Sequence, residues 1–96
     1  MTAHEGRRIR VNGRVQGVGF RAAACIEARR LGVTGWVRNR RDGSVEAVVH
    51  GTPDTVAAML AWLRRGPADA SVTHVAVEFV EPGNDRFSGF DALPTV

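Results

Sequence analysis

The sequence predicts an α+β sandwich of the ferredoxin-like, split βαβ type: an antiparallel sheet with two helices on one face. Three observations lead to this prediction. Short segments with apolar residues at every second position predict strands, and two longer segments predict helices. The segments follow one another in the order strand, helix, strand, strand, helix, strand. Glycine, proline or an Asp-Gly pair separates neighbouring segments, as expected where one element ends and the next begins.

The first strand is expected over residues 7–12, where Ile9 and Val11 stand at period two. The first helix is expected from about Arg21 to Leu31, because this stretch consists mainly of good helix formers and Gly32 follows as a typical stop. Its apolar stripe is narrow and consists of Ala24, Ala28 and Leu31. Cys25 and Ile26 do not fit this stripe cleanly.

A β-hairpin is expected next, with strands over residues 34–40 and 44–51. The first strand alternates between the two faces of a sheet, and the second has small apolar residues at every second position. The pair Asp42-Gly43 between them favours a tight turn. We expect Trp36, the large apolar residue of the first strand, in the core.

The second helix has clear boundaries. Thr52 is a good N-cap, Pro53 suits the first helical position, and Gly66-Pro67 ends the helix. Its apolar residues stand at i, i+3, i+4 and i+7, and they are Val56, Met59, Leu60 and Leu63. A strand over residues 71–80 follows, and then a short edge segment around Phe87 and Phe90.

Length and composition favour one domain over residues 1–96, with 1–6 as a flexible tail. Cys25 is the only cysteine, which argues against a disulfide framework and for a reducing compartment, the cytoplasm. No apolar run is long enough to span a membrane. The net charge is only +3 and the arginines are spread along the chain, so they indicate a solvated surface.

The loop GRVQGVGFR, residues 13–21, is the most informative stretch. A glycine-containing turn that leaves a strand and enters a helix presents free backbone N–H groups beside the positive end of the helix dipole, and such a place binds anions. Gly17 and Gly19 allow positive φ and close approach of a ligand. Arg21 is expected in the first turn of the helix, where its positive charge is unfavourable beside the positive end of the helix dipole. An anion bound between the guanidinium and the helix start would remove this unfavourable interaction. The spacing matches neither the dinucleotide fingerprint nor the P-loop.

The stretches VNGRVQGVGFR, LGVTGWVRN and DGSVEAVVHG resemble the acylphosphatase family in order, spacing and sequence. Together with WLRRGP and FSGF they cover nearly the whole chain. The family pattern runs G-x-V-Q-G-V-x-F-R and later G-W-V-x-N. The resemblance implies that Arg21 and Asn39 are the catalytic pair. It also implies that the phosphate-binding loop consists of Val15, Gln16, Gly17, Val18, Gly19 and Phe20.

The implied reaction is hydrolysis of a small acyl phosphate to a carboxylate and inorganic phosphate, with the phosphate product as a competitive ligand. Backbone donors and Arg21 would hold the phosphoryl oxygens, and Asn39 would orient a water for direct attack on phosphorus. We expect no metal and no cofactor, because the acyl phosphate is already reactive. His4, His50 and His74 have no metal-site spacing and are expected at the surface or a strand edge. Cys25 is expected as a small packed side chain.

Three alternatives stand beside this reading. An RNA-recognition module shares the order of elements, but residues 44–51 lack the aromatic residues on which such modules stack bases, so we expect no nucleic-acid partner. A similar domain in hydrogenase-maturation carbamoyltransferases handles carbamoyl phosphate, although no zinc-finger cysteines are present here. A slow phosphate-binding protein is the third, because Ala22, Ala23 and Ala24 stand where the family often has an aromatic residue and a threonine. We expect a monomer.

Overall fold

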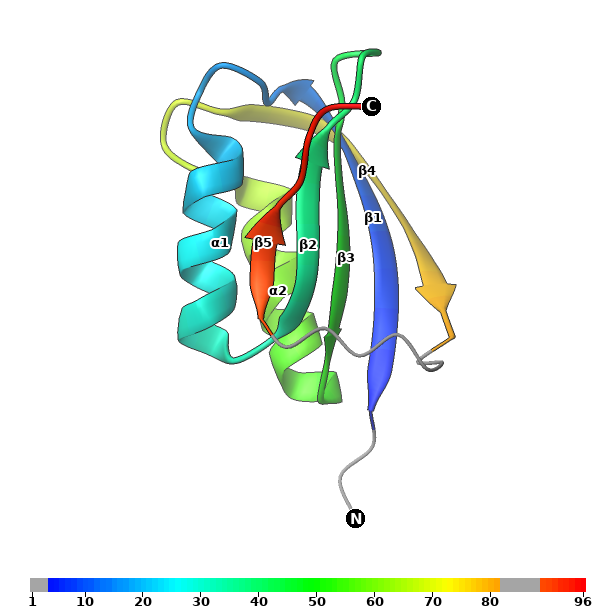
Figure 1. Ribbon diagram of the computed structural model, residues 1–96. Helices are drawn as coiled ribbons and strands as arrows, with labels where there is room; N and C mark the ends of the chain where they lie inside the picture. Colours follow the sequence, from blue (N-terminus) through cyan, green and yellow to red (C-terminus); the bar gives the residue numbers. More distant parts are fainter. Residues whose placement is uncertain (1–3, 82–88) are drawn as a thin grey trace.

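The computed structural model describes residues 4–81 and 89–96, which form one five-stranded sheet with two helices packed on one face (Figure 1). The elements in chain order are β1 (Glu5–Arg14), α1 (Phe20–Leu31), β2 (Thr34–Asn39), β3 (Val45–Gly51), α2 (Pro53–Arg65), β4 (Ser71–Val80) and β5 (Phe90–Ala92). This confirms the predicted ferredoxin-like order. Neither helix in the described ranges is long and apolar enough to cross a membrane.

The strand order is β4-β1-β3-β2-β5. Strands β1 to β4 pair in antiparallel fashion, as predicted, but β5 pairs in parallel with β2 from Gly35 opposite Phe90 to Val37 opposite Ala92. The sheet is therefore mixed rather than purely antiparallel. A three-residue strand has too little periodic pattern to reveal its direction in the sequence. Phe87, expected in the same edge segment, lies outside the described residues.

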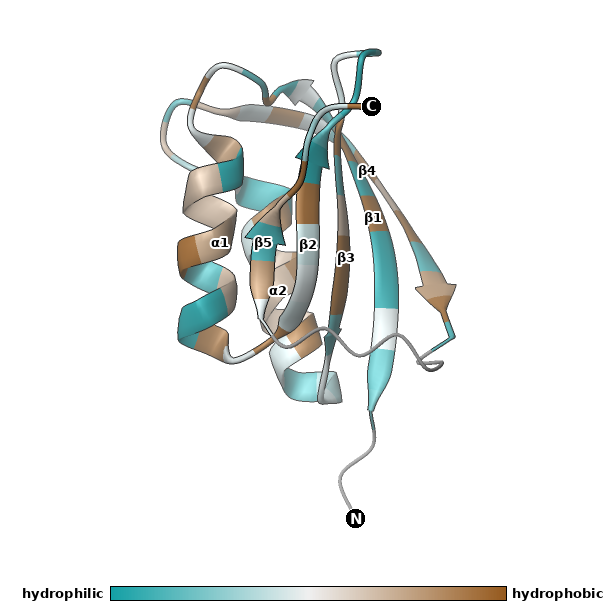
Figure 2. Ribbon diagram, viewed as in Figure 1, coloured by the Kyte–Doolittle hydropathy of each residue, from teal (hydrophilic) through white to brown (hydrophobic). Residues whose placement is uncertain are grey.

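The core lies between the helices and the face of the sheet that they cover. Helix α1 packs against β2 and β5, and α2 packs against β1, β3 and β4. Apolar and polar residues alternate along β1 (Figure 2). Its apolar residues Ile9 and Val11 face the helices and are buried in this core. On α1, Cys25 joins Ala24 and Ala28 in the core whereas Ile26 is exposed. Burial raises the pKa of the Cys25 thiol, which is free, as expected for a packed side chain.

Strand β1 starts at Glu5 and not at residue 7, so the predicted tail over residues 1–6 is wrong for Glu5 and Gly6. Glu5 pairs with Gly51, and Gly6 pairs with His50. Backbone pairing extends the strand there although the side chains have no apolar alternation. Residues 1–3 lie outside the described part of the chain.

Two predictions about single side chains were wrong. Trp36 is not in the core: it is half-buried on the open face of the sheet, where the Arg38 guanidinium carbon lies 4.6 Å from its ring centre. Strand alternation allows only one of two neighbours to face the helices, and Val37 takes that place. His50 is buried and not at the surface, because β3 is the central strand and side chains cover both of its faces. His4 and His74 are exposed, as expected.

Candidate active site

The loop between β1 and α1 depends on two glycines in the left-handed region. Gly17 has φ 73° and Gly19 has φ 78°. A Cβ atom at either position would meet nothing within 4 Å, so the backbone conformation and not crowding favours glycine there. The prediction of positive φ at both glycines is confirmed.

Helix α1 starts directly after Gly19, which is its N-cap. Its first turn lies entirely within the described residues. No side chain caps this turn, and none of its residues is acidic. The N–H groups that begin a helix have no partner within the helix, and here no capping side chain competes for them. Together with the positive end of the helix dipole, they form a place suited to an anion.

A pocket of about 410 Å³ lies where this loop, the start of α1, the end of β2 and β5 meet. Its lining consists of Val15, Gln16, Gly17, Gly19, Phe20, Arg21, Ala22, Asn39 and Ala92. The structure therefore brings Arg21 and Asn39 together with most of the predicted loop. Val18 is the exception, because its side chain packs against the core and does not line the pocket. Phe20 anchors the loop, with its ring edge-on to Trp62 at 5.5 Å between ring centres.

Arg21 lies in the first turn of α1 and is half-buried. No residue in the described ranges forms a hydrogen bond or an ion pair with its guanidinium. Within the described part of the chain, no carboxylate therefore compensates the basic group that opposes the helix dipole. A bound phosphoryl group would supply the missing negative charge.

Asn39 is the last residue of β2, and alternation sends its side chain to the same face as Val37, the face covered by the helices. Its Oδ1 atom is buried and accepts no hydrogen bond from any described residue. An unsatisfied buried acceptor typically costs about 1–3 kcal/mol, which a water or a substrate in the pocket would offset. The backbone of Asn39 is fixed separately, because its carbonyl oxygen accepts a hydrogen bond of 3.2 Å from Val96 N.

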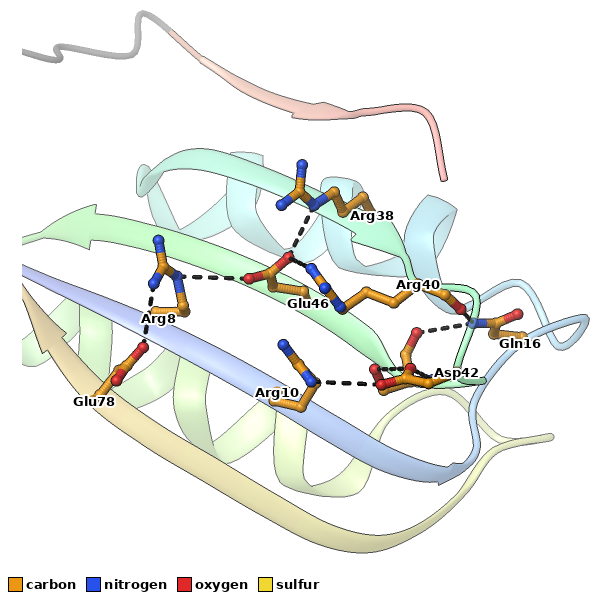
Figure 3. A network of polar contacts seen from close by, with 9 residues as sticks. Arg8, Arg10, Gln16, Arg38, Arg40, Asp42, Glu46 and Glu78 are labelled. Atoms are coloured by element: carbon orange, nitrogen blue, oxygen red, sulfur yellow. Dashed lines mark hydrogen bonds and ion pairs between the residues drawn. The ribbon is translucent and has the colours of Figure 1, made fainter. Parts of the chain in front are cut away.

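The side chain of Gln16 points to the β2–β3 turn (Figure 3). Its amide nitrogen donates to the carbonyl oxygens of Arg40, at 2.7 Å, and Ser44, at 2.8 Å. The loop is thus tied to the residue that follows Asn39. Sequence analysis placed Gln16 in the loop, but the local sequence carries no signal for the partners of its side chain.

On the open face of the sheet, Glu46 is the centre of a cluster of arginines that the sequence analysis missed (Figure 3). Its Oε1 accepts hydrogen bonds of 2.9 Å from Arg38 Nε and from Arg40 Nη1, and its Oε2 lies 3.5 Å from Arg8 Nε. Burial raises the pKa of the Glu46 carboxyl, but the hydrogen bonds and charges of Arg38 and Arg40 outweigh it, and the net pKa is lowered. The hairpin register, which sets Arg38 opposite Glu46, was the available signal.

The family model for acylphosphatase matches residues 7–92. The chain belongs to the acylphosphatase family. It is 54% identical over 89 residues to the acylphosphatase of Azoarcus sp. strain BH72, covering 93% of this chain and 89% of that protein. It is 55% identical over 85 residues to the acylphosphatase of Thermococcus kodakarensis, covering 88% of this chain and 91% of that protein.

A solved structure supports the same assignment. The acylphosphatase of Bacillus subtilis superposes with a TM-score of 0.88 at 32% sequence identity, covering 93% of this chain and 98% of that one. The resemblance inferred from the loop and hairpin motifs is therefore confirmed.

The three alanines after Arg21, in which this chain departs from the acylphosphatase pattern, have different environments. Ala22 lines the pocket, Ala23 is half-buried and Ala24 is part of the core.

Among the described residues, no group of three or more histidine, cysteine, aspartate or glutamate side chains is arranged to hold a metal ion. The polar groups that line the acylphosphatase pocket are instead the backbone of the loop, one guanidinium and one side-chain amide, together with Gln16. These groups can bind an anion and orient a water.

Proposed function

We propose that the chain hydrolyses the carboxyl–phosphate bond of small acyl phosphates through the pocket that Arg21 and Asn39 share. Membership of the acylphosphatase family makes it a hydrolase of acyl phosphates. The observation that carries the mechanism is that three components meet in one pocket. They are a helix start without a side-chain cap, the Arg21 guanidinium and the Asn39 amide oxygen, and neither side-chain group has a partner among residues 4–81 and 89–96.

The phosphoryl group is assigned to the loop over residues 15–20 and to Arg21. Backbone N–H groups and a bidentate guanidinium contact hold its oxygens and stabilise the charge that develops during attack. The side chain of Val18 packs away from the pocket, so only its backbone takes part. Ala22 and Ala92 also line the pocket, and we assign the acyl group to the space beside their small side chains.

We assign to Asn39 the role of orienting the water that attacks phosphorus. A side-chain amide does not titrate near neutral pH, so it serves by accepting from and donating to the water rather than by removing a proton. Attack of this water on phosphorus breaks the bond between phosphorus and the acyl oxygen, and it releases a carboxylate and inorganic phosphate. Neither a phosphoenzyme nor a metal ion is part of the proposal.

Several finer points complete the proposal. Inorganic phosphate binds the same cradle and acts as a competitive inhibitor. The chain works as a monomer, without a nucleic-acid partner. A cytoplasmic location is proposed from the single free cysteine, Cys25.

The test is hydrolysis of benzoyl phosphate by the purified protein in EDTA, with Arg21→Ala beside it. The matched control is Arg64→Ala, which removes an exposed arginine of α2 that does not line the pocket. We expect rapid turnover in the wild type and in the control, and turnover lower by about 100- to 1000-fold or more in Arg21→Ala. Loss of activity on chelation contradicts the metal-free mechanism. Faster turnover of carbamoyl phosphate points to that substrate instead, and phosphate binding without turnover points to a binding protein.

A further inference from the structure

The end of β2 is held from the face of the sheet that is opposite to the pocket. Asn39 stands between Arg38 and Arg40, and alternation along the chain sends these two arginines to the open face while Asn39 faces the helices. Both guanidinium groups donate to the same oxygen, Glu46 Oε1, at 2.9 Å each. One carboxylate thus holds both neighbours of Asn39.

Glu46 is well placed for this task because it lies on the central strand. In the register of the sheet it stands opposite Arg38 of β2 on one side and Arg10 of β1 on the other. Its side chain is only 5% exposed, whereas those of Arg38 and Arg40 are 25% and 30% exposed. Interactions between charges that are partly removed from water are screened less than those at the surface.

Removal of this charge would leave two arginines directed at one point with no anion between them. The two guanidinium groups repel each other, so their side chains move apart. This movement is expected to displace the backbone at the end of β2. Arg40 transmits the change further, because its carbonyl oxygen accepts the hydrogen bond from Gln16. Asn39 lies between the two displaced residues.

We propose that Glu46 is a positioning residue, which fixes Asn39 against the phosphate-binding loop from the opposite face of the sheet. The proposal rests on the proposed role of Asn39 in orienting the water. Glu46 acts through Arg38 and Arg40, and it does not touch the substrate. Its loss therefore affects the aim of the water more than the hold on the phosphate.

The first experiment compares Glu46→Gln with Glu78→Gln in the hydrolysis of benzoyl phosphate. Glu78 is a matched control, because its carboxylate also pairs with an arginine of this face, Arg8, but it is 63% exposed and makes no contact with Arg38 or Arg40. We expect kcat to fall about 10- to 100-fold in Glu46→Gln, as for a catalytic group displaced by about 1 Å, and to stay unchanged in Glu78→Gln. The inhibition constant of inorganic phosphate stays close to the wild-type value in both. An unchanged kcat in folded Glu46→Gln overturns the proposal.

A double-mutant cycle shows whether Glu46 acts through Asn39. In an Asn39→Ala background, Glu46→Gln is expected to reduce kcat no further, because the group that it positions is already absent. A second full reduction in kcat would mean that the two residues act independently. Glu46→Asp keeps the charge and draws it back by one methylene, and it is expected to give a smaller fall in kcat with the same unchanged phosphate inhibition. It carries the test if Glu46→Gln does not fold.

A second readout does not depend on activity. In ¹⁵N-labelled protein, the side-chain amide resonance of Asn39, identified by its absence from Asn39→Ala, is expected to shift in Glu46→Gln and to stay in place in Glu78→Gln. A stationary resonance in Glu46→Gln contradicts the link between Glu46 and Asn39. If the wild type fails to hydrolyse benzoyl phosphate but the resonance shifts as expected, the proposed function is wrong while the structural link holds.

Discussion

Gln16 joins the two halves of the pocket through Arg40, whose carbonyl oxygen accepts a 2.7 Å hydrogen bond from the Gln16 amide. The same nitrogen donates to Ser44 across the turn. The loop that we assign to the phosphate and the strand end that carries Asn39 are therefore connected directly, and not only through the core. Displacement of one half is expected to displace the other.

Gln16→Met keeps the length of the side chain and removes both donors. The carbonyl oxygens of Arg40 and Ser44 each lose one hydrogen bond but keep the backbone ones from Gly43 N and Arg40 N. A neutral hydrogen bond typically contributes about 0.5–1.5 kcal/mol to stability. We expect a loss of that size in the free energy of unfolding, measured with urea, and at least a tenfold fall in kcat/KM for benzoyl phosphate. A variant that is less stable but fully active would show that the link is structural only.

The proposed separation between holding and aiming predicts different defects for Arg21→Ala and Asn39→Ala. Arg21→Ala removes a charged donor to the phosphoryl oxygens, so turnover falls by about 100- to 1000-fold or more and inorganic phosphate inhibits more weakly. Asn39→Ala loses turnover to a similar extent, but phosphate still binds because the cradle is intact. Steady-state kinetics with phosphate as inhibitor measures both quantities. Equal weakening of phosphate binding in the two variants would show that the roles are wrongly assigned.

The sequence predicted the elements because they depend on local pattern, whereas the pairing of Arg21 with Asn39 was implied by the resemblance to the acylphosphatase family. Period-two alternation, the Thr52-Pro53 helix start and the Asp-Gly turn each act within a few residues, and they produced boundaries close to those observed. The loop could be recognised as an anion site from its glycines and from the position of Arg21. These features do not depend on distant parts of the chain.

The wrong predictions concern features that depend on the assembled sheet. Alternation shows that Trp36 and Val37 face opposite ways, but only the packed helices decide which face is the core. His50 is buried because β3 is central, a position that the order of the elements along the chain does not state. The role of Glu46 requires β2 and β3 to be paired in register, which the sequence suggests only after the hairpin is accepted.

Gly19→Ala tests whether the cradle requires close approach to the backbone. A residue with a Cβ pays about 1–2 kcal/mol in the left-handed region, and Gly43 in the β2–β3 turn, with φ 95°, provides a control with comparable strain. A Cβ meets no protein atom at either position. We expect similar losses in the free energy of unfolding for Gly19→Ala and Gly43→Ala, measured with urea. Weaker phosphate inhibition is expected in Gly19→Ala only, and equal inhibition in the two variants would argue against phosphate at this loop.

Glu46 also predicts a specific dependence of stability on pH. The carboxyl has a lowered pKa in the folded protein, below its ordinary value of 4.5, so between these two values the unfolded chain binds the proton more readily. The stabilising contribution of Glu46 is therefore fully present above the unfolded pKa and is lost as the pH falls through the folded pKa.

Glu46→Gln has no such carboxyl, and its free energy of unfolding should fall less than that of the wild type when the pH is lowered from about 6 to about 3. Asp42 and Glu27 also have lowered pKa values, through hydrogen bonds from Ser44 and Arg30, and they contribute equally to both proteins. The difference between the two curves, measured by urea unfolding at each pH, therefore isolates Glu46. Parallel curves over this range would mean that Arg38 and Arg40 do not favour the ionised form of Glu46 in the folded state. The proposed positioning of Asn39 by Glu46 would then have no electrostatic basis.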